Sequence, residues 1–242
     1  MVIAEAKGIG KWYEDKCVLL QCSMEIRAGE SYGLVGINGA GKTTLMKILL
    51  GLQRAEEGSV LLFGEKPQTD RRYLTRIGSM IERPVFYEHL NAVENLKMHL
   101  AYMQTSGNIS EILHQTGLFS VRNKPVSTYS LGMKQRLGLA RAMIHHPDLL
   151  VLDEPFNGMD PVAVSESIHL LKNVAEGGTA ILLSSHRLWE VRQTTDRVGI
   201  LSGGQICTEI SKEDVLWQDV KSMEAFVVDH MRRGGDSYEE LV

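Results

Sequence analysis

The sequence predicts an α/β fold whose largely parallel core sheet is interrupted by an α-helical subdomain. Strand-like apolar runs alternate with helical segments along most of the chain, a pattern typical of a parallel sheet covered on both faces. Within the interval 92–146 the apolar spacing is helical and no strand pattern intervenes. We therefore expect a single domain over 1–242, with a helical subdomain at about 88–146 and a short C-terminal extension at about 211–242.

The first half of the chain supplies strands, a glycine-rich loop and the helical interval. Two strand-like runs, 17–26 and 31–37, are separated by a turn at 27–29, and the second run ends in the glycine-rich loop. The next expected elements are a helix over 42–50 and strands over 58–64 and 77–81. The spacing of Leu96, Leu100 and Met103 then predicts one helix over 92–115.

The second half alternates regularly between helix and strand. A helix over 131–146 is expected to end at Pro147, because proline disfavours helical geometry in the residue before it. The remaining expected elements are a strand over 149–152, a helix over 161–175, a strand over 178–184, a helix over 187–195 and a strand over 197–201.

Composition argues against nucleic acid as a partner. The chain has 26 Lys and Arg residues against 30 Asp and Glu residues, so it lacks the basic excess of a general nucleic-acid binder.

No apolar run approaches the roughly 20 residues that cross a bilayer, and we expect a cytosolic protein. Cys17, Cys22 and Cys207 are odd in number and lack metal-ligand spacing, which favours reduced structural thiols.

Residues 36–43 fit a phosphate-binding loop of Gly, four residues and Gly-Lys-Ser/Thr, placed between a predicted strand and a predicted helix. Its glycines let backbone amides and the positive helix end face an anion. Lys42 adds a charge near the β and γ phosphates, and Thr43 is expected to hold Mg²⁺, so the expected cofactors are ATP and Mg²⁺. The expected nucleotide-binding residues here are Gly36, Asn38, Gly39, Ala40, Gly41, Lys42, Thr43 and Thr44.

Two adjacent carboxylates follow the apolar strand 149–152. This strand places Asp153 and Glu154 at the sheet edge where open α/β sheets bind ligands. Asp153 is expected to reach Mg²⁺, and Glu154 to polarise the attacking water as the general base. His186, after the next strand, is expected to contact the γ-phosphate. Adjacent acids can instead cap a turn, and a lone histidine is usually structural, but the phosphate-binding loop in the same chain favours the catalytic interpretation.

The segment between these motifs carries a family resemblance. Residues 129–136, Tyr-Ser-Leu-Gly-Met-Lys-Gln-Arg, resemble the signature motif of ATP-binding cassette (ABC) proteins, in the Ser-Leu-Gly-Met variant. Six ordered motifs extend the resemblance over residues 3 to about 205. It implies the ABC ATPase fold, a P-loop NTPase with an N-terminal antiparallel β subdomain.

The resemblance also implies roles for further residues. Tyr13 matches the aromatic residue that stacks on adenine, Asp160 belongs to the D-loop, and His186 matches the switch histidine. Two copies of the chain would sandwich ATP, with Ser130, Gly132 and Met133 of one copy facing the phosphate-binding loop of the other.

A literal copy of the commonest signature, Ser-Gly-Gly-Gln, occurs at 202–205. It follows a predicted strand and lies beyond His186, and another strand-like run follows it. We therefore interpret it as a tight turn between two strands and retain Ser130 and Gly132 as the signature residues.

Glu82 stands where the resembling family normally carries glutamine. A carboxylate still offers oxygen to Mg²⁺, so Glu82 is a candidate metal ligand, although neutral drift at a tolerant loop position is an alternative. Glu82, Pro84 and the Ser-Leu-Gly-Met signature together resemble the bacitracin-resistance and lantibiotic-immunity branch of the family.

The resemblance implies an ATP-hydrolysing subunit, peripheral on the cytoplasmic side of the cell membrane, that powers export of a peptide antibiotic. Its expected partners are a second copy of itself and integral membrane permease subunits contacting about 82–96. One alternative is the same transporter role with a lipid, drug or ion as cargo. Another is a soluble ABC ATPase, but such proteins usually carry two cassettes or long coiled coils, and this chain shows neither. The amphipathic stretch 220–231 is expected to pack on its own domain, with a dimer contact as the alternative.

Overall fold

A six-stranded sheet lies at the centre of the chain, which the computed structural model describes over residues 1–67 and 72–236, with side chains as far as residue 230. From one edge to the other its strands are β5 (Ile77–Met80), β6 (Leu149–Asp153), β7 (Ala180–Ser185), β3 (Ser31–Val35), β8 (Arg197–Ser202) and β9 (Gln205–Ser211). Only the β8–β9 pair is antiparallel. The carboxyl ends of the parallel strands therefore open on one edge of the sheet.

Strand β6 shows how the sheet separates two hydrophobic cores. Leu149 and Val151 belong to the core shared with helix α1 (Lys42–Leu49), whereas Leu150 and Leu152 belong to the core on the opposite face. Successive strand residues point to opposite faces, so an unbroken apolar run is what a strand covered on both sides requires. The second core includes residues of α4 (Leu131–Met143), α5 (Pro161–Glu176) and α6 (Leu188–Thr194).

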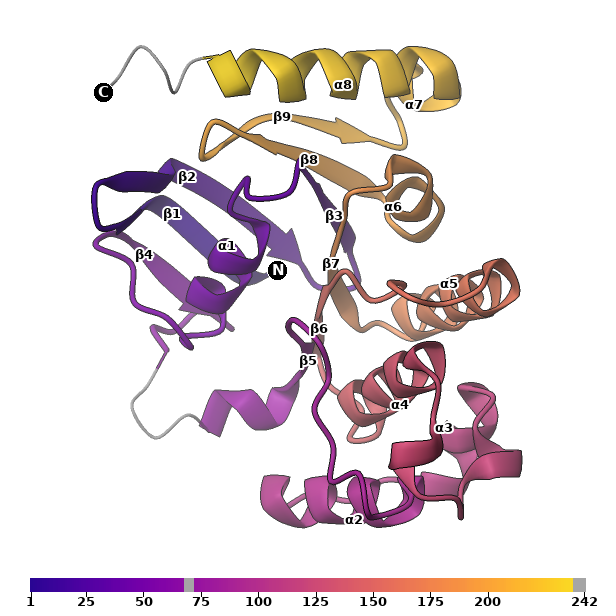
Figure 1. The fold of residues 1–242 in the computed structure, drawn as a ribbon. Coiled ribbons are helices and arrows are strands. Elements are labelled where there is room, and N and C mark those ends of the chain that lie inside the picture. Colours follow the sequence, from indigo (N-terminus) through magenta and orange to yellow (C-terminus); the bar gives the residue numbers. More distant parts are fainter. Residues whose placement is uncertain (68–71, 237–242) are drawn as a thin grey trace.

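An antiparallel three-stranded sheet packs beside the central one, as Figure 1 shows. Its order is β2 (Lys16–Arg27), β1 (Val2–Tyr13) and β4 (Glu57–Leu62). No strand is predicted over 2–13 from the apolar pattern, because register shifts along β1 disturb the alternation of inward and outward side chains. The two sheets and the helical insertion confirm the predicted ABC ATPase fold class.

The helical subdomain contains a break that the sequence pattern did not predict. The single helix expected over 92–115 is wrong, since α2 (Ala92–Met103) and α3 (Ile109–Gln115) are separate helices. Gln104 adopts a left-handed conformation that ends α2, and the side chain of Asn108 caps α3. Gly107 lies between them so close to the end of α4 that a Cβ atom would fall 2.2 Å from the Ile144 carbonyl oxygen. In Figure 1 these helices lie together, apart from the antiparallel sheet.

Short 3₁₀ turns complete the connections around this subdomain. They are η1 (Arg72–Arg76), η2 (Phe119–Val121) and η3 (Val126–Thr128).

No helix within the described ranges is both long enough and apolar enough to span a membrane.

The C-terminal segment folds back over the central sheet. Gly203 and Gly204 have positive φ angles and connect β8 to β9, as predicted for this literal signature sequence. After α7 (Val215–Gln218), helix α8 (Val220–Asp236) buries Met223 and Val227 in the second core and lies along β8 (Figure 1). The amphipathic stretch thus packs on its own domain, and residues 237–242 of the predicted extension lie outside the described residues.

A pair of histidines lies between α2 and the end of α4. The ring centroids of His99 and His145 are 5.7 Å apart, and the Nε2 atom of His99 and the Nδ1 atom of His145 are buried with no hydrogen-bond partner among the described residues. Burial, followed by the positive charges of His145 and Arg141, lowers the pKa of His99 to about 4. Packing of the helical subdomain therefore favours a neutral His99.

We predict that acid weakens this packing. His99 remains neutral in the folded chain but takes a proton near pH 6.5 when unfolded, so its contribution is present above pH 6.5 and is lost as the pH falls towards about 4. His99→Leu should lose less stability than the unaltered chain between these pH values, as measured by urea denaturation. The control is His169→Gln, which changes an exposed histidine of α5 and should leave the pH dependence unaltered. Equal acid sensitivity in all three proteins would contradict the prediction.

Candidate functional site

The phosphate-binding loop runs from the end of β3 into α1 at the carboxyl edge of the sheet. A Cβ atom on Gly36 would fall 2.6 Å from the Leu201 carbonyl oxygen, and one on Gly41 would fall 2.9 Å from the Leu19 side chain. Gly39 has a positive φ angle with open space beside it. Close packing on the inner side therefore requires glycine, while the outer side presents backbone to a ligand.

Lys42 is held inside the curve of this loop. Its Nζ atom donates to the carbonyl oxygens of Gly36, at 2.8 Å, and Ile37, at 3.2 Å, and lies 3.7 Å from Oε1 of Glu154. Burial lowers the pKa of Lys42, while Glu154 and Asp153 act in the opposite direction. The structure thus places a desolvated cation where the loop would receive phosphate, an arrangement that strengthens its attraction for an anion.

Asp153 joins three elements through one carboxylate. Thr43 Oγ1 of α1 donates to Asp153 Oδ2 at 2.6 Å, and Ser184 Oγ of β7 donates to Asp153 Oδ1 at 2.5 Å. The hydroxyl of Thr43 and the carboxylate of Asp153 are hard oxygen donors in contact, the type of ligand that Mg²⁺ prefers. The loop and these oxygens together therefore fit a magnesium nucleotide.

Glu154 and His186 form a second pair beside Asp153. His186 Nδ1 lies 2.8 Å from Glu154 Oε2, while the Glu154 backbone N–H donates to Ser184 Oγ at 3.0 Å. Glu154 adopts a left-handed backbone conformation, with φ of 49°, which is uncommon for a residue with a side chain. The carboxylate is thus fixed between Lys42 and His186, where it can accept a proton from water.

Glu82 lines the same hollow, of about 360 Å³, as Asp153 and Glu154. The hollow is lined by Glu82, Arg83, Leu131, Gln135, Asp153, Glu154, Asn157 and Gly158. Glu82 also has a left-handed φ of 60°, and its Oε1 atom accepts a hydrogen bond from Lys47 Nζ of α1. The structure therefore brings Glu82 to the same hollow as Asp153 and Glu154.

The predicted signature residues begin helix α4, where Ser130 is exposed, whereas Met133 is half-buried and packs against the second core. Ser130 is the exposed N-cap, and its hydroxyl accepts from the Met133 backbone N–H at 3.2 Å. A Cβ atom on Gly132 would lie 3.1 Å from the Gly158 carbonyl oxygen, which places the signature beside the predicted D-loop. Asp160 caps α5, and the N–H of Ala163 is the largest influence that lowers its pKa. Among the described residues, no hydrogen bond joins Ser130 or Gly132 to Lys42.

Tyr13 ends β1 with about half of its surface exposed. Its hydroxyl accepts a hydrogen bond from Gln53 Nε2, and this bond is the largest influence that lowers the pKa of Tyr13. A hydrogen bond with Thr44 and the charges of Lys11 and Lys47 act in the same direction. An exposed ring anchored beside α1 is suited to stacking on a planar base.

Three residues of this constellation were not singled out in the sequence. Ser184 supports both acids, Lys47 contacts Glu82, and Gln53 contacts Tyr13. Ser184 had a usable signal, because it lies near the end of β7, the strand that pairs with β6, and stands opposite Asp153. Lys47 and Gln53 act through contacts far apart in sequence, which no local pattern indicates.

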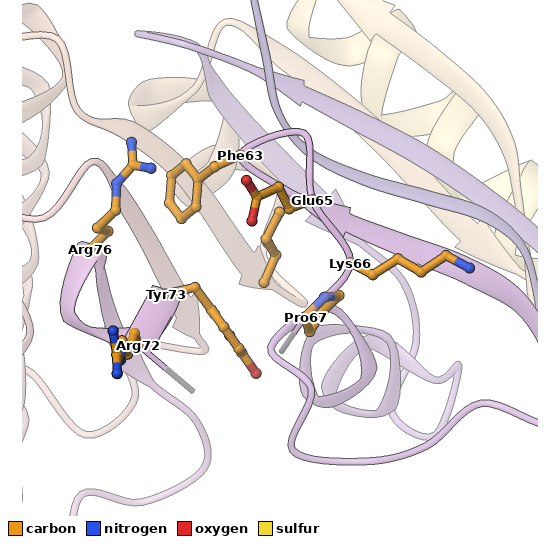
Figure 2. A pocket seen from close by; sticks show the side chains of 8 residues that line it. Phe63, Glu65, Lys66, Pro67, Arg72, Tyr73 and Arg76 are labelled. Atoms are coloured by element: carbon orange, nitrogen blue, oxygen red, sulfur yellow. The ribbon is translucent and has the colours of Figure 1, made fainter. Parts of the chain in front are cut away.

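A separate pocket of about 240 Å³ lies between β4 and η1, as Figure 2 shows. Arg76 stacks over the Phe63 ring at 3.7 Å and forms an ion pair with Asp148 at 2.6 Å. None of the predicted site residues lines this pocket. It is therefore distinct from the constellation at the sheet edge.

Comparison with known proteins gives the same family throughout. The sequence pattern of the family described as ABC transporter matches residues 19–157. Over 232 residues the chain is 38% identical to the bacitracin transport ATP-binding protein BcrA of Enterococcus faecalis, covering 94% of this chain and 75% of that protein. It is 40% identical over 204 residues to the lantibiotic transport ATP-binding protein SrtF of Streptococcus pyogenes, covering 84% and 88%.

Other similarities carry less information on cargo. An uncharacterized ABC transporter ATP-binding protein of Bacillus subtilis, YcbN, is 44% identical over 92% of this chain and 74% of its own length. A solved ATP-binding subunit of an ABC transporter superposes with a TM-score of 0.82 at 26% identity, covering 93% of this chain and 99% of that one.

We predict that Ser184→Ala weakens the fold and the site together. The variant removes a fully buried donor to Asp153, and a hydrogen bond to a charged group contributes about 2 kcal/mol. The free energy of unfolding should fall by about that amount in chemical denaturation. Ser167→Ala is the control, since that buried hydroxyl has the Met159 sulfur, at 3.5 Å, as its hydrogen-bond acceptor within the described residues and contacts no charged group there. Equal losses in the two variants would show that the Asp153 contact contributes nothing specific.

Proposed function

This chain belongs to the ABC transporter family as an ATP-binding and ATP-hydrolysing subunit, and from that premise we propose that it powers export of a bacitracin-like or lantibiotic peptide through separate permease subunits. The observation that carries the cargo is the similarity to BcrA and SrtF over most of the chain. Glu82 and the Ser-Leu-Gly-Met signature support the same branch.

For hydrolysis, the proposal divides the work among residues at the sheet edge. Mg²⁺ would be held by Thr43 and Asp153, together with Glu82, which lines the same hollow as Asp153. When bound, the ion supplies positive charge that offsets the negative charge of the phosphates. Lys42 binds the phosphates. Glu154 accepts the proton of the attacking water at its carboxylate, and His186 orients that carboxylate through the contact at 2.8 Å.

A second copy of the chain would complete each nucleotide site. Ser130 and Asp160 are exposed, and Leu131 between the signature positions is 47% exposed although it is apolar. Gly132 lies beside Gly158, so the signature and the D-loop form one continuous outward surface. This arrangement supports a sandwich in which the α4 helix start of one copy meets the phosphate-binding loop of its partner.

The segment 82–96 would meet the permease. Val85 is 81% exposed and Tyr87 is 56% exposed, an unusual pair of apolar side chains on the surface of a loop. The Asn95 side chain fixes this loop, because it bonds both the N–H and the carbonyl of Tyr87. A preformed apolar surface supports docking of a membrane subunit, which would place the chain peripherally on the cytoplasmic face of the cell membrane.

We predict that Glu154→Gln separates nucleotide binding from turnover. The amide keeps the shape of the side chain but cannot accept a proton from water, so the variant should bind ATP and dimerise without hydrolysing it. Phosphate release and size-exclusion chromatography measure the two properties. Lys42→Ala, by contrast, should weaken ATP binding itself. Substantial steady-state hydrolysis by Glu154→Gln would refute the assigned role of Glu154.

The cargo is tested in cells that carry the gene. Tagged protein purified from detergent-solubilised membranes should retain polytopic membrane proteins, and cells in which Glu154→Gln replaces the native chain should become more sensitive to bacitracin or to a lantibiotic. Polytopic partners with unchanged sensitivity would retain the transporter and exclude these peptides as cargo. Recovery of ribosomal or DNA-repair proteins alone would overturn the transporter role.

A further inference from the structure

Glu82 is tied to the phosphate-binding helix by an ion pair. Lys47 Nζ of α1 lies 2.5 Å from Glu82 Oε1, with 31% of the lysine side chain and 63% of the glutamate side chain exposed. The two residues come from different parts of the fold, since Lys47 follows the phosphate-binding loop and Glu82 follows the edge strand β5. The contact therefore connects the nucleotide-binding helix with the segment that leads into the helical subdomain.

Lys47 occupies a central position among the candidate site residues. It lies one helical turn after Thr43, so the two side chains share a face of α1. Its charge also acts on the hydroxyl of Tyr13. The ammonium group therefore contacts Glu82, and Lys47 lies on the helix that follows the phosphate-binding loop.

The backbone of Glu82 adds a reason for an anchor. Its left-handed conformation is strained for a residue that carries a side chain, and such strain persists where surrounding contacts fix it. Among the described residues, Lys47 is the hydrogen-bond partner of the Glu82 carboxylate. A glutamine at this position would keep a polar oxygen but would lose the charge attraction that the lysine supplies.

We propose that Lys47 is a positioning residue for ATP hydrolysis, which orients the Glu82 carboxylate at the hollow shared with Asp153 and Glu154. The inference rests on the role proposed above for Glu82 and adds a second residue that the glutamate requires. The charge of Lys47 holds the Glu82 carboxylate in place. Because Lys47 lies on helix α1, the position of the Glu82 carboxylate is fixed relative to the phosphate-binding loop.

A double-mutant cycle over Lys47→Met and Glu82→Gln tests this role with two readouts. Lys47→Met should lower kcat about fivefold with a smaller change in KM, Lys47→Arg should restore kcat, and the double variant should be no slower than Glu82→Gln alone. In the nucleotide-free protein the two substitutions should also be non-additive in urea denaturation midpoint, because each breaks the same contact.

Asp148→Asn is the matched control. It removes the charge from the Arg76–Asp148 ion pair, which is comparably exposed and lies at the opposite end of β5. This variant should shift the denaturation midpoint but leave kcat unchanged, as expected of an ion pair with a structural role only.

The outcomes separate the two proposals. A slow Glu82→Gln variant with a fully active Lys47→Met variant would overturn the role of Lys47 and leave Glu82 in the site. Full activity of Glu82→Gln would overturn this inference but leave residue 82 in the site, because the amide keeps an oxygen ligand and loses only the charge attraction to Lys47. Multiplicative losses of kcat in the double variant would show that the two residues act separately, which also overturns the inference. None of these results depends on the cargo.

Discussion

The Asp153 carboxylate accepts hydroxyl hydrogen bonds from two directions, and the surrounding site is organised by these contacts. Thr43 reaches it from α1 and Ser184 from β7, so one side chain fixes the relative position of a helix and two strands. Glu154 is the next residue along the chain. The fixed position of Asp153 therefore also sets that of Glu154, whose carboxylate lies between Lys42 and His186. Parallel strands make the arrangement possible, because their carboxyl ends meet at one edge.

Two residues that line the hollow have a strained backbone. Glu82 and Glu154 both adopt left-handed conformations, which cost of order 1–3 kcal/mol each and persist only when the surrounding structure fixes them. At Glu154 the fixing contacts are the two hydrogen bonds from its N–H to Ser184, and at Glu82 the contact is with Lys47. Two strained glutamates therefore line one hollow, and the carboxylate of each contacts a basic side chain, Lys47 at Glu82 and His186 at Glu154.

Features that contiguous residues encode are predictable from the sequence. The loop at 36–43 and the apolar strand leading to Asp153 are local patterns, and the resemblance of residues 129–136 between them implies the ABC ATPase fold that the structure shows. Features that depend on tertiary contacts are not predictable in this way. The break between α2 and α3 depends on the close approach of Gly107 to Ile144. In β1, bulges interrupt the alternating apolar pattern by which a strand is predicted. The support of Asp153 by Ser184 depends on the pairing register of β6 and β7, which no single segment contains.

The edge strand β5 limits how copies of the chain can associate. It is only four residues long, and Pro84, which has no backbone N–H to donate, follows four residues after its end. A short edge that cannot extend its hydrogen-bond ladder is a poor template for adding a strand from another molecule. Sheet-to-sheet polymerisation is thereby disfavoured at this side of the protein, and reversible association through loops and helix ends can proceed without competition from aggregation there.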